Sequence, residues 1–319
     1  MPFSLRSLRA YLKIAPDATS FVARGFQIGS PSIQELLEHS ANTFVLGYHA
    51  ALESNDNAAL ATRLEEIDQP FRGFAYEGAG MALAILDFFS PWNQRFLSFS
   101  LAEGNNHIYM LYVGWGWSMG RLPRKQIAIT RKNSYDPLLR WLAYDGYGFH
   151  EGFFSWKKSL VQHRQPALLP RGYARRAFDQ GLGRSLWFVC CGDVSLVAQR
   201  INAFPESRQA DIWSGIGLAC AYAGGSKEQD QEKLLELSAP FHQHLAQGAA
   251  FAVKARSRAG NLGPHTEQAC HVLCGASADE VISIIDSATK DLPQDGLEPS
   301  FEAWRQRIQT ALATPVAST

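Results

Sequence analysis

The chain has 319 residues, of which 46% are hydrophobic, and it carries 30 basic and 30 acidic side chains. This composition excludes a chain that is disordered over most of its length, because enough apolar material is present to offset the entropy lost on ordering. The zero net charge argues against nucleic-acid binding. No apolar run reaches the roughly 20 residues of a membrane helix, and no apolar block follows the basic start of the chain. We therefore expect a globular, cytoplasmic protein without an integral membrane segment.

A glycine motif recurs along the chain at nearly constant intervals. The full motif is an aromatic residue, a polar residue and a glycine, followed by small residues at alternate positions, and the copies around Gly47 and Gly248 are looser. The intervals between successive copies are 31, 36, 32, 35, 34 and 33 residues. A period near 34 residues is typical of a repeated helix–turn–helix unit. The motif glycines are Gly47, Gly78, Gly114, Gly146, Gly181, Gly215 and Gly248.

The fold predicted from this motif is all-α, with helical-hairpin repeats of about 34 residues that form a curved solenoid or an α/α toroid. The motif copies lie in apolar stretches too long for typical strands, and shorter amphipathic segments separate them. A strand with a glycine bulge remains the alternative for the segment HIYMLYVGWGW. We expect an N-terminal cap over 1–38, the repeats over 39–275, capping helices over 276–312 and a disordered tail over 313–319.

The repeated glycines need a physical reason, because glycine inside a helix costs about 1 kcal/mol relative to alanine. The fourth residue after each glycine lies on the same helical face and is small in six of the seven copies. We expect this seam of small residues to let neighbouring helix backbones approach closely. The residues at this position are Ala51, Ala82, Ser118, His150, Ser185, Ala219 and Ala252.

Polar and aromatic residues precede the motif glycines and are predicted to share the face opposite the small seam. The position directly before the glycine is polar in five of seven copies, and the position before that is aromatic in four. We expect this face to line a groove or cavity in which buried carboxylates have raised pKa values and act as general acids or bases. The alternative is that these polar groups only satisfy one another. The candidate catalytic residues are Glu77, Asp145, His150, Glu151 and Asp179.

Departures from the motif add candidates, because function often breaks a structural pattern. His49 follows its glycine by two residues, where the other copies have glycine or alanine, and His150 takes a position that is otherwise small. Arg184 is expected to pair with Asp179 or to clamp an anionic ligand. The alternative for each histidine is a structural hydrogen bond. The substrate-binding candidates are His49, Tyr76, Trp115, Trp117, Tyr144, Gln180, Arg184 and Trp213.

An Arg-Gly-aromatic triplet recurs outside the motif glycines, at Arg24, Arg72 and Arg171. An arginine near a helix start is not favoured by the helix dipole. We expect these arginines to brace neighbouring repeats through carboxylates.

Motifs for cofactors and metals are missing from the sequence. The recurring Gly-x-Gly lacks the dinucleotide-binding and P-loop contexts, and no zinc spacing or nucleophile elbow occurs. The five cysteines form no CxxC pair, so we expect buried free thiols. We predict no cofactor and no metal, with metal binding through scattered histidines as the alternative.

Several motifs resemble those of the UnbL-like family, a bacterial family first noted beside enediyne polyketide synthases. The similar segments are GFAYEGAGMALAILDFF, VGWGWSMGRLP, WLAYDGYGFHEGFF, FDQGLGRSLWFV and DIWSGIGLACAYAGG, and the resemblance spans roughly residues 20–290. It implies a role in specialised-metabolite biosynthesis, on or near a polyene or polyketide-type product. It supplies no catalytic residues.

The sequence is therefore compatible with two functions. The first is an enzyme that promotes acid–base cyclisation or rearrangement of a hydrophobic polyene, terpenoid or polyketide-type substrate, with aromatic walls that stabilise developing positive charge. The second is a non-catalytic helical-repeat scaffold that binds a polyketide synthase or a carrier protein. A closed cavity would favour the enzyme, and an open groove would favour the scaffold.

Overall fold

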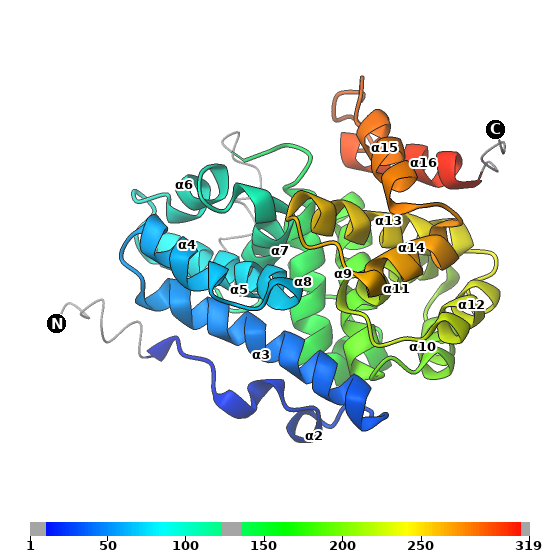
Figure 1. Cartoon of the computed structure of the whole chain (residues 1–319), viewed down its shortest axis with the longest axis horizontal. Coiled ribbons are helices and arrows are strands. Elements are labelled where there is room, and N and C mark those ends of the chain that lie inside the picture. The colour runs from blue at the N-terminus through cyan, green and yellow to red at the C-terminus, as the bar shows by residue number, and fades with distance from the viewer. Residues whose placement is uncertain (1–10, 123–134, 314–319) are drawn as a thin grey trace.

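The computed structural model describes residues 11–122 and 135–313, and every regular element in these two ranges is a helix (Figure 1). The predicted all-α class is confirmed. The segment proposed as an alternative strand is helical, because it forms most of α7 (Ile108–Met119). The first ten residues of the expected N-terminal cap, and the expected tail beyond residue 313, lie outside the described residues.

Seven helices carry the motif glycines and pack side by side in chain order. The backbone of each glycine helix closely approaches the backbone of the next one at the motif glycines. The first of them begins at Pro31, ahead of the boundary expected at residue 38. The glycine helices are α3 (Pro31–Glu53), α5 (Gln69–Phe89), α7, α8 (Trp141–Phe154), α9 (Tyr173–Val189), α11 (Glu206–Ala223) and α13 (His242–Arg258).

Shorter helices connect the glycine helices or follow them. They include α4, α6, α10 and α12, each between two glycine helices, and a π-helical turn, η4, after α8. The two helices expected near the C-terminus are present as α15 and α16, and α16 packs on α13 (Figure 1). The bounds are η1 (Pro16–Thr19), α2 (Phe21–Arg24), α4 (Asn57–Glu65), α6 (Arg95–Leu101), η2 (Asn105–His107), η4 (Lys157–Val161), α10 (Val194–Asn202), α12 (Glu228–Leu237), α14 (Pro264–Cys274), α15 (Ala278–Ala288) and α16 (Ser300–Ala313).

The glycines of α7 show why glycine recurs in these helices. A Cβ atom on Gly114 would lie 1.8 Å from the carbonyl oxygen of Glu77, on the preceding glycine helix. A Cβ atom on Gly116 would lie 1.9 Å from the carbonyl oxygen of Ala143, on the following one. The missing side chains therefore leave room for Cα–H···O contacts between backbones, of the kind found where helices pack closely. The same pairing recurs at Gly146 and Gly148, Gly181 and Gly183, and Gly215 and Gly217.

This arrangement corrects the predicted helical wheel. Residues two positions apart on a helix are related by a rotation of about 200°, so they point in nearly opposite directions. The two glycines of one motif therefore contact two different neighbouring helices. The first glycine lies against the preceding helix, and the second lies against the next one. The close packing therefore occupies both flanks of each glycine helix.

Helices that are distant in the packing order also contact one another. Gln69 at the start of α5 donates a 2.6 Å hydrogen bond to the carbonyl oxygen of Gly260, directly beyond α13. Across the interior, the ring centroids of Phe44 on α3 and Trp117 on α7 are 4.4 Å apart. The interior side chains of the glycine helices therefore meet in one buried core.

Candidate functional site

The interior of the glycine-helix layer is lined by residues one position before the motif glycine and three positions after it. These positions are four residues apart, so they lie within about 40° of each other on a helix. The first set contributes the polar side chains, among them Glu77, Asp145 and Gln180. The second set contributes Trp117 and Arg184. Five of the predicted site residues are therefore brought together.

Arg184 connects two buried carboxylates at the centre of this group. Its Nη1 donates a 2.5 Å hydrogen bond to Oδ1 of Asp145, and its Nη2 lies 3.5 Å from Oε1 of Glu77. The side chains of all three residues are at most 4% exposed. Gln180 donates to the other oxygen of Asp145 at 2.8 Å, and Trp117 Nε1 donates to Oε1 of Glu77 at 2.9 Å. Two carboxylates thus share one guanidinium in a site without solvent.

The two carboxylates differ in the length of their contact with Arg184. Asp145 makes a short ion pair and accepts a second hydrogen bond, whereas Glu77 has a longer contact with Arg184. Burial raises the pKa of Glu77, and the nearby charge of Asp145 raises it further, against the opposing effects of Arg184 and Trp117. Burial lowers the pKa of Arg184, but the carboxylates of Asp145 and Glu77 reverse that effect and raise it. The group is therefore arranged to keep Arg184 charged and to favour a protonated Glu77.

A chain of buried polar side chains continues from this group toward the C-terminal helix. Ser214 bridges Gln180 and Gln247 through hydrogen bonds of 3.2 and 3.0 Å. Arg305 of α16 then donates to Gln247 at 2.9 Å and to Asp211 at 2.7 Å. Because each bond here satisfies a buried polar group, this part of the chain fixes α16 on the glycine helices.

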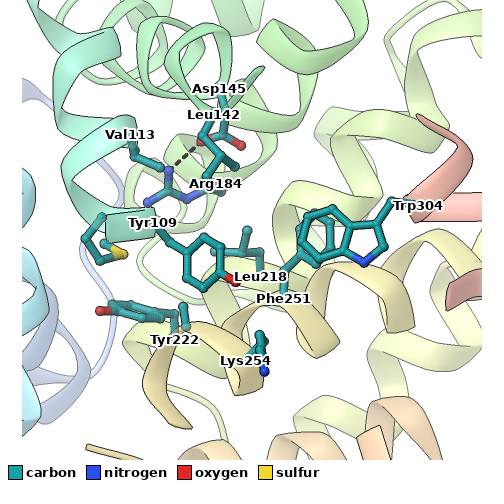
Figure 2. A pocket seen from close by; sticks show the side chains of 12 residues that line it. Tyr109, Val113, Leu142, Asp145, Arg184, Leu218, Tyr222, Phe251, Lys254 and Trp304 are labelled. Atoms are coloured by element: carbon teal, nitrogen blue, oxygen red, sulfur yellow. Dashed lines mark hydrogen bonds and ion pairs between the residues drawn. The ribbon is translucent and has the colours of Figure 1, made fainter. Parts of the chain in front are cut away.

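Two small cavities adjoin the Glu77–Arg184–Asp145 group. We name them the Asp145 cavity, of about 40 Å³, and the Glu77 cavity, of about 30 Å³. Arg184 and Asp145 line the first, and Figure 2 shows this pair on one side of it, with Phe251 and Trp304 farther along the wall. Glu77 lines the second. The ion group therefore contributes to the walls of both cavities.

The Glu77 cavity has a strongly aromatic wall. Glu77 is the one ionisable group among the described residues that line it, and seven of those thirteen residues are aromatic. Trp117 and Phe149 are in ring contact at 4.9 Å, and the Arg184 guanidinium lies 5.0 Å from the Phe149 ring centroid. The aromatic residues are Phe44, Phe74, Trp117, Phe149, Phe153, Phe154 and Phe188.

Asp179 and Tyr76 lie apart from the interior group, although the wheel predicted a shared face. Asp179 pairs with Arg208 at 2.5 Å and accepts a hydrogen bond from Gln165 at 3.0 Å. The expected pairing of Arg184 with Asp179 is therefore wrong. Tyr76 donates to Glu65 of α4 at 2.8 Å. Tyr76 thus contacts a shorter helix, and Asp179 contacts the first turn of α11 and the connection before α9, because residues two positions before the glycine are rotated by about 100° from the interior position.

Other predicted substrate-binding residues are also distributed over separate environments. Trp115 stacks on Tyr135, with ring centroids 4.4 Å apart. His49 accepts a 3.1 Å hydrogen bond from the backbone of Ile14. Tyr144 and Trp213 are buried, but neither lines the two interior cavities.

His150 and Glu151 form a pair at the end of α8. His150 Nδ1 lies 3.1 Å from Oε1 of Glu151, and the histidine is buried. Burial lowers the pKa of His150, against the opposing effect of Glu151. Its ring is 5.0 Å from that of Phe154, a residue of the Glu77 cavity. The pair is therefore close to the cavity wall without lining the cavity itself.

The recurring Arg-Gly triplets have two different roles. Arg24 donates to the carbonyl oxygens of Phe153 and Phe154 at 2.8 and 2.7 Å, rather than to a carboxylate as expected. Arg72 does pair with a carboxylate, that of Glu65 on α4, at 2.6 Å. The position of Arg24 beside the aromatic cavity wall was not predicted, although the recurrence of the Arg-Gly-aromatic triplet in the sequence marked this residue.

Comparison with known families gives a match over nearly the whole chain. Residues 4–312 match the family described as "Protein of unknown function (DUF1702)". The chain belongs to this family. No significant match was found among curated proteins or among solved structures. The resemblance to the UnbL-like family is not tested by these findings and stays a prediction.

The described part of this DUF1702 chain offers no ready metal centre. Within residues 11–122 and 135–313, no group of three or more histidine, cysteine, aspartate or glutamate side chains could hold a metal ion. The five cysteines are buried free thiols. None of the helices in the same ranges is long and apolar enough to cross a bilayer.

Proposed function

We propose that the protein is an enzyme of specialised-metabolite biosynthesis in which Glu77 is the general acid. The substrate would be a hydrophobic polyene, terpenoid or polyketide-type molecule whose reacting part enters the Glu77 cavity. The observation that carries this proposal is a buried carboxyl group with a raised pKa in a mostly aromatic wall that holds no other ionisable group among the described residues. A protonated acid beside aromatic ring faces is suited to forming and stabilising a cation.

The contacts of Glu77 indicate which atom carries the proton. Trp117 and Arg184 both approach Oε1, so Oε1 is the accepting oxygen and Oε2 is left to hold the proton. Transfer of that proton to an electron-rich double bond forms a C–H bond and leaves a carbocation and the Glu77 carboxylate. The cation closes onto a second double bond, and loss of a proton back to Glu77 completes an isomerisation in which no atom is gained or lost.

Arg184 and Asp145 have positioning roles in this proposal. Their ion pair supplies no net charge to the wall, so it does not repel a cation as an unpaired arginine would. The nearby Arg184 guanidinium stabilises the Glu77 carboxylate that forms on proton transfer. The same interaction limits how far burial raises the pKa of Glu77.

The cavities are much smaller than the roughly 300–1,000 Å³ of typical ligand pockets. A polyene can therefore enter only if aromatic side chains of the wall move apart. We propose further that the glycine helices with their short partners are repeats of about 34 residues in a curved, toroid-like layer. Support comes from the regular motif spacing and from the contact between the region after α13 and the start of α5.

The test is complementation of a strain that lacks this gene, with intermediates identified by mass spectrometry. Glu77→Gln keeps the acceptor for Trp117 but removes the acid, so it should accumulate the same intermediate as the deletion. Asp179→Asn is the matched control, because Asp179 is an equally buried carboxylate outside the interior, and it should restore the product. Normal product formation by a folded Glu77→Gln variant would refute the proposal.

The second candidate is a non-catalytic scaffold for a synthase or carrier domain. It is favoured by exposed apolar side chains around the connection between α5 and α6, where Trp92 is 76% and Leu101 66% exposed. Contiguous patches of such side chains mark protein contacts. This function predicts that a Trp92→Ser/Leu101→Ser variant loses co-purification of a synthase partner and fails to complement, whereas Glu77→Gln complements.

A further inference from the structure

A larger cavity lies outside the aromatic wall, between α2 and the end of α8. Its volume is about 340 Å³, which is within the range of small-molecule pockets. Arg24, Lys157 and Lys158 line it, together with Phe154 and Trp156. We name it the outer cavity. The π-helical turn η4 begins at Lys157, and such turns are frequent at functional sites.

The outer cavity has an excess of positive charge. Its lining includes three basic side chains and no acidic one among the described residues. A fourth cation is close, because the guanidinium groups of Arg24 and Arg121 each lie 4.9 Å from the Phe154 ring centroid. Burial lowers the pKa of Arg24, and the charge of Arg121 lowers it further. The Nε atom of Arg24 is buried without a hydrogen-bond partner in the described part of the chain.

Phe154 connects this basic cavity with the Glu77 cavity, because its side chain lines both. Around its ring, His150 is 5.0 Å away and Trp117 is 6.0 Å away, measured between ring centroids. A ligand that spans Phe154 would have an anionic end among Arg24, Lys157 and Lys158 and an apolar end among aromatic rings. Neither cavity alone offers both environments.

We propose that the outer cavity binds the phosphate end of an amphipathic substrate, whose apolar chain passes Phe154 into the Glu77 cavity. A phosphate group is favoured over a carboxylate because several cations converge and phosphate carries more charge and more acceptor oxygens. This inference rests on the proposed function for the direction of the chain, and it names the substrate class as an organic phosphate.

The test is calorimetric titration of the full chain with octyl phosphate below its micelle concentration. Octyl phosphate should bind at least tenfold more tightly than 1-octanol, which lacks the charge, and than butyl phosphate, which buries less apolar surface. Lys157→Gln/Lys158→Gln should weaken octyl phosphate binding about tenfold. Lys233→Gln/Lys290→Gln removes two exposed lysines elsewhere and should leave the affinity unchanged.

Each contrary outcome overturns the inference. Equal binding of octyl phosphate and 1-octanol would show that no anion site exists, and equal binding of butyl and octyl phosphate would show that the chain stays in solvent. Unchanged affinity of Lys157→Gln/Lys158→Gln would place the phosphate elsewhere. Binding to phosphatidylglycerol vesicles but not to dispersed octyl phosphate would indicate a membrane surface instead.

This result is separable from the proposed catalysis. Binding of octyl phosphate is measured on the unmodified chain and involves no proton transfer, whereas complementation by Glu77→Gln tests the proton transfer alone. If Glu77→Gln restores the product while octyl phosphate still binds, the general-acid proposal fails and the phosphate site stands.

Discussion

Glu77 on α5 and Arg184 on α9 approach to 3.5 Å, although α7 and α8 lie between their helices in the packing order. A flat row of helices would keep these side chains apart, because adjacent helix axes are separated by about 8–10 Å. The two side chains therefore meet across the buried core, past the helices that lie between them. It also brings two carboxylates onto one guanidinium, since Asp145 of α8 reaches Arg184 from the helix next to it.

Replacing Gly114 with alanine should destabilise the fold even though alanine favours helix formation. The new methyl group would lie 1.8 Å from the Glu77 carbonyl oxygen, and a backbone atom cannot move aside as a flexible side chain can. We expect a loss of at least about 2 kcal/mol in urea unfolding. Gly296→Ala is the control, because its methyl group would meet nothing within 4 Å. Equal stability of both variants would contradict the close backbone packing.

Arg184→Met should cost about 3–5 kcal/mol of unfolding free energy, because it leaves the buried Asp145 carboxylate without its cation. Adding Asp145→Asn should recover part of this loss, since that uncompensated charge is then removed. Lys13→Met breaks an exposed pair with Glu53 and should cost less than about 1 kcal/mol. Strictly additive losses in the double variant would show that the two residues are not coupled.

The stability difference between Glu77→Gln and the unmodified chain should depend on pH. The folded-state pKa of Glu77 is raised, so the folded chain binds the proton more tightly than the unfolded chain. Its stabilising contribution is complete below about pH 4.3, the ordinary value for glutamate, and is lost as the pH rises through the folded pKa. Glutamine does not titrate, so the variant should gain stability relative to the unmodified chain across that rise. A pH-independent difference in urea midpoints would rule out a raised pKa.

His107→Phe should reduce the sensitivity of the fold to acid. Burial lowers the pKa of His107 to about 4, and its ring stacks on Tyr76 with centroids 3.9 Å apart. Between about pH 6.5 and pH 4 the unfolded chain binds this proton and the folded chain does not, so stability falls as the pH falls by up to about 3 kcal/mol. Phenylalanine keeps the stacking without the titration. His271→Phe, on the exposed side of α14, should retain the original acid sensitivity in thermal unfolding at several pH values.

The helices and the interior polar residues could be predicted from the sequence because both follow a helical period. The motif around Gly146 predicted the helix α8, and Asp145 was identified as a polar residue in an apolar stretch. Which neighbours a glycine contacts could not be predicted, because positions 0 and +2 are both glycine and each packs on a different helix. The wheel therefore grouped Tyr76 and Asp179 with the interior, while the structure places Tyr76 against α4 and Asp179 against the first turn of α11.

Contacts between helices that are distant in the sequence could not be predicted either. Arg184 was expected to pair within its own helix, but its partners are 39 and 107 positions earlier in the chain, at Asp145 and Glu77. Such pairings depend on how the helices are arranged in space, which the periodicity along a single helix does not determine. The placement of Arg24 beside Phe154 has the same origin, because it joins α2 to the end of α8 across 130 positions.

The contacts between motif glycines and backbone carbonyl groups make the arrangement of the helices independent of the side chains that line the interior. Helix spacing is set by main-chain atoms, which are the same whatever side chains surround them. Interior residues such as Trp117, Phe149 and Leu218 project from that frame and do not determine it. Relatives could therefore exchange these side chains, and so the molecule they accept, without altering the distances between helices. Library design can use the same division by holding the glycines constant and varying the residues three positions after each one.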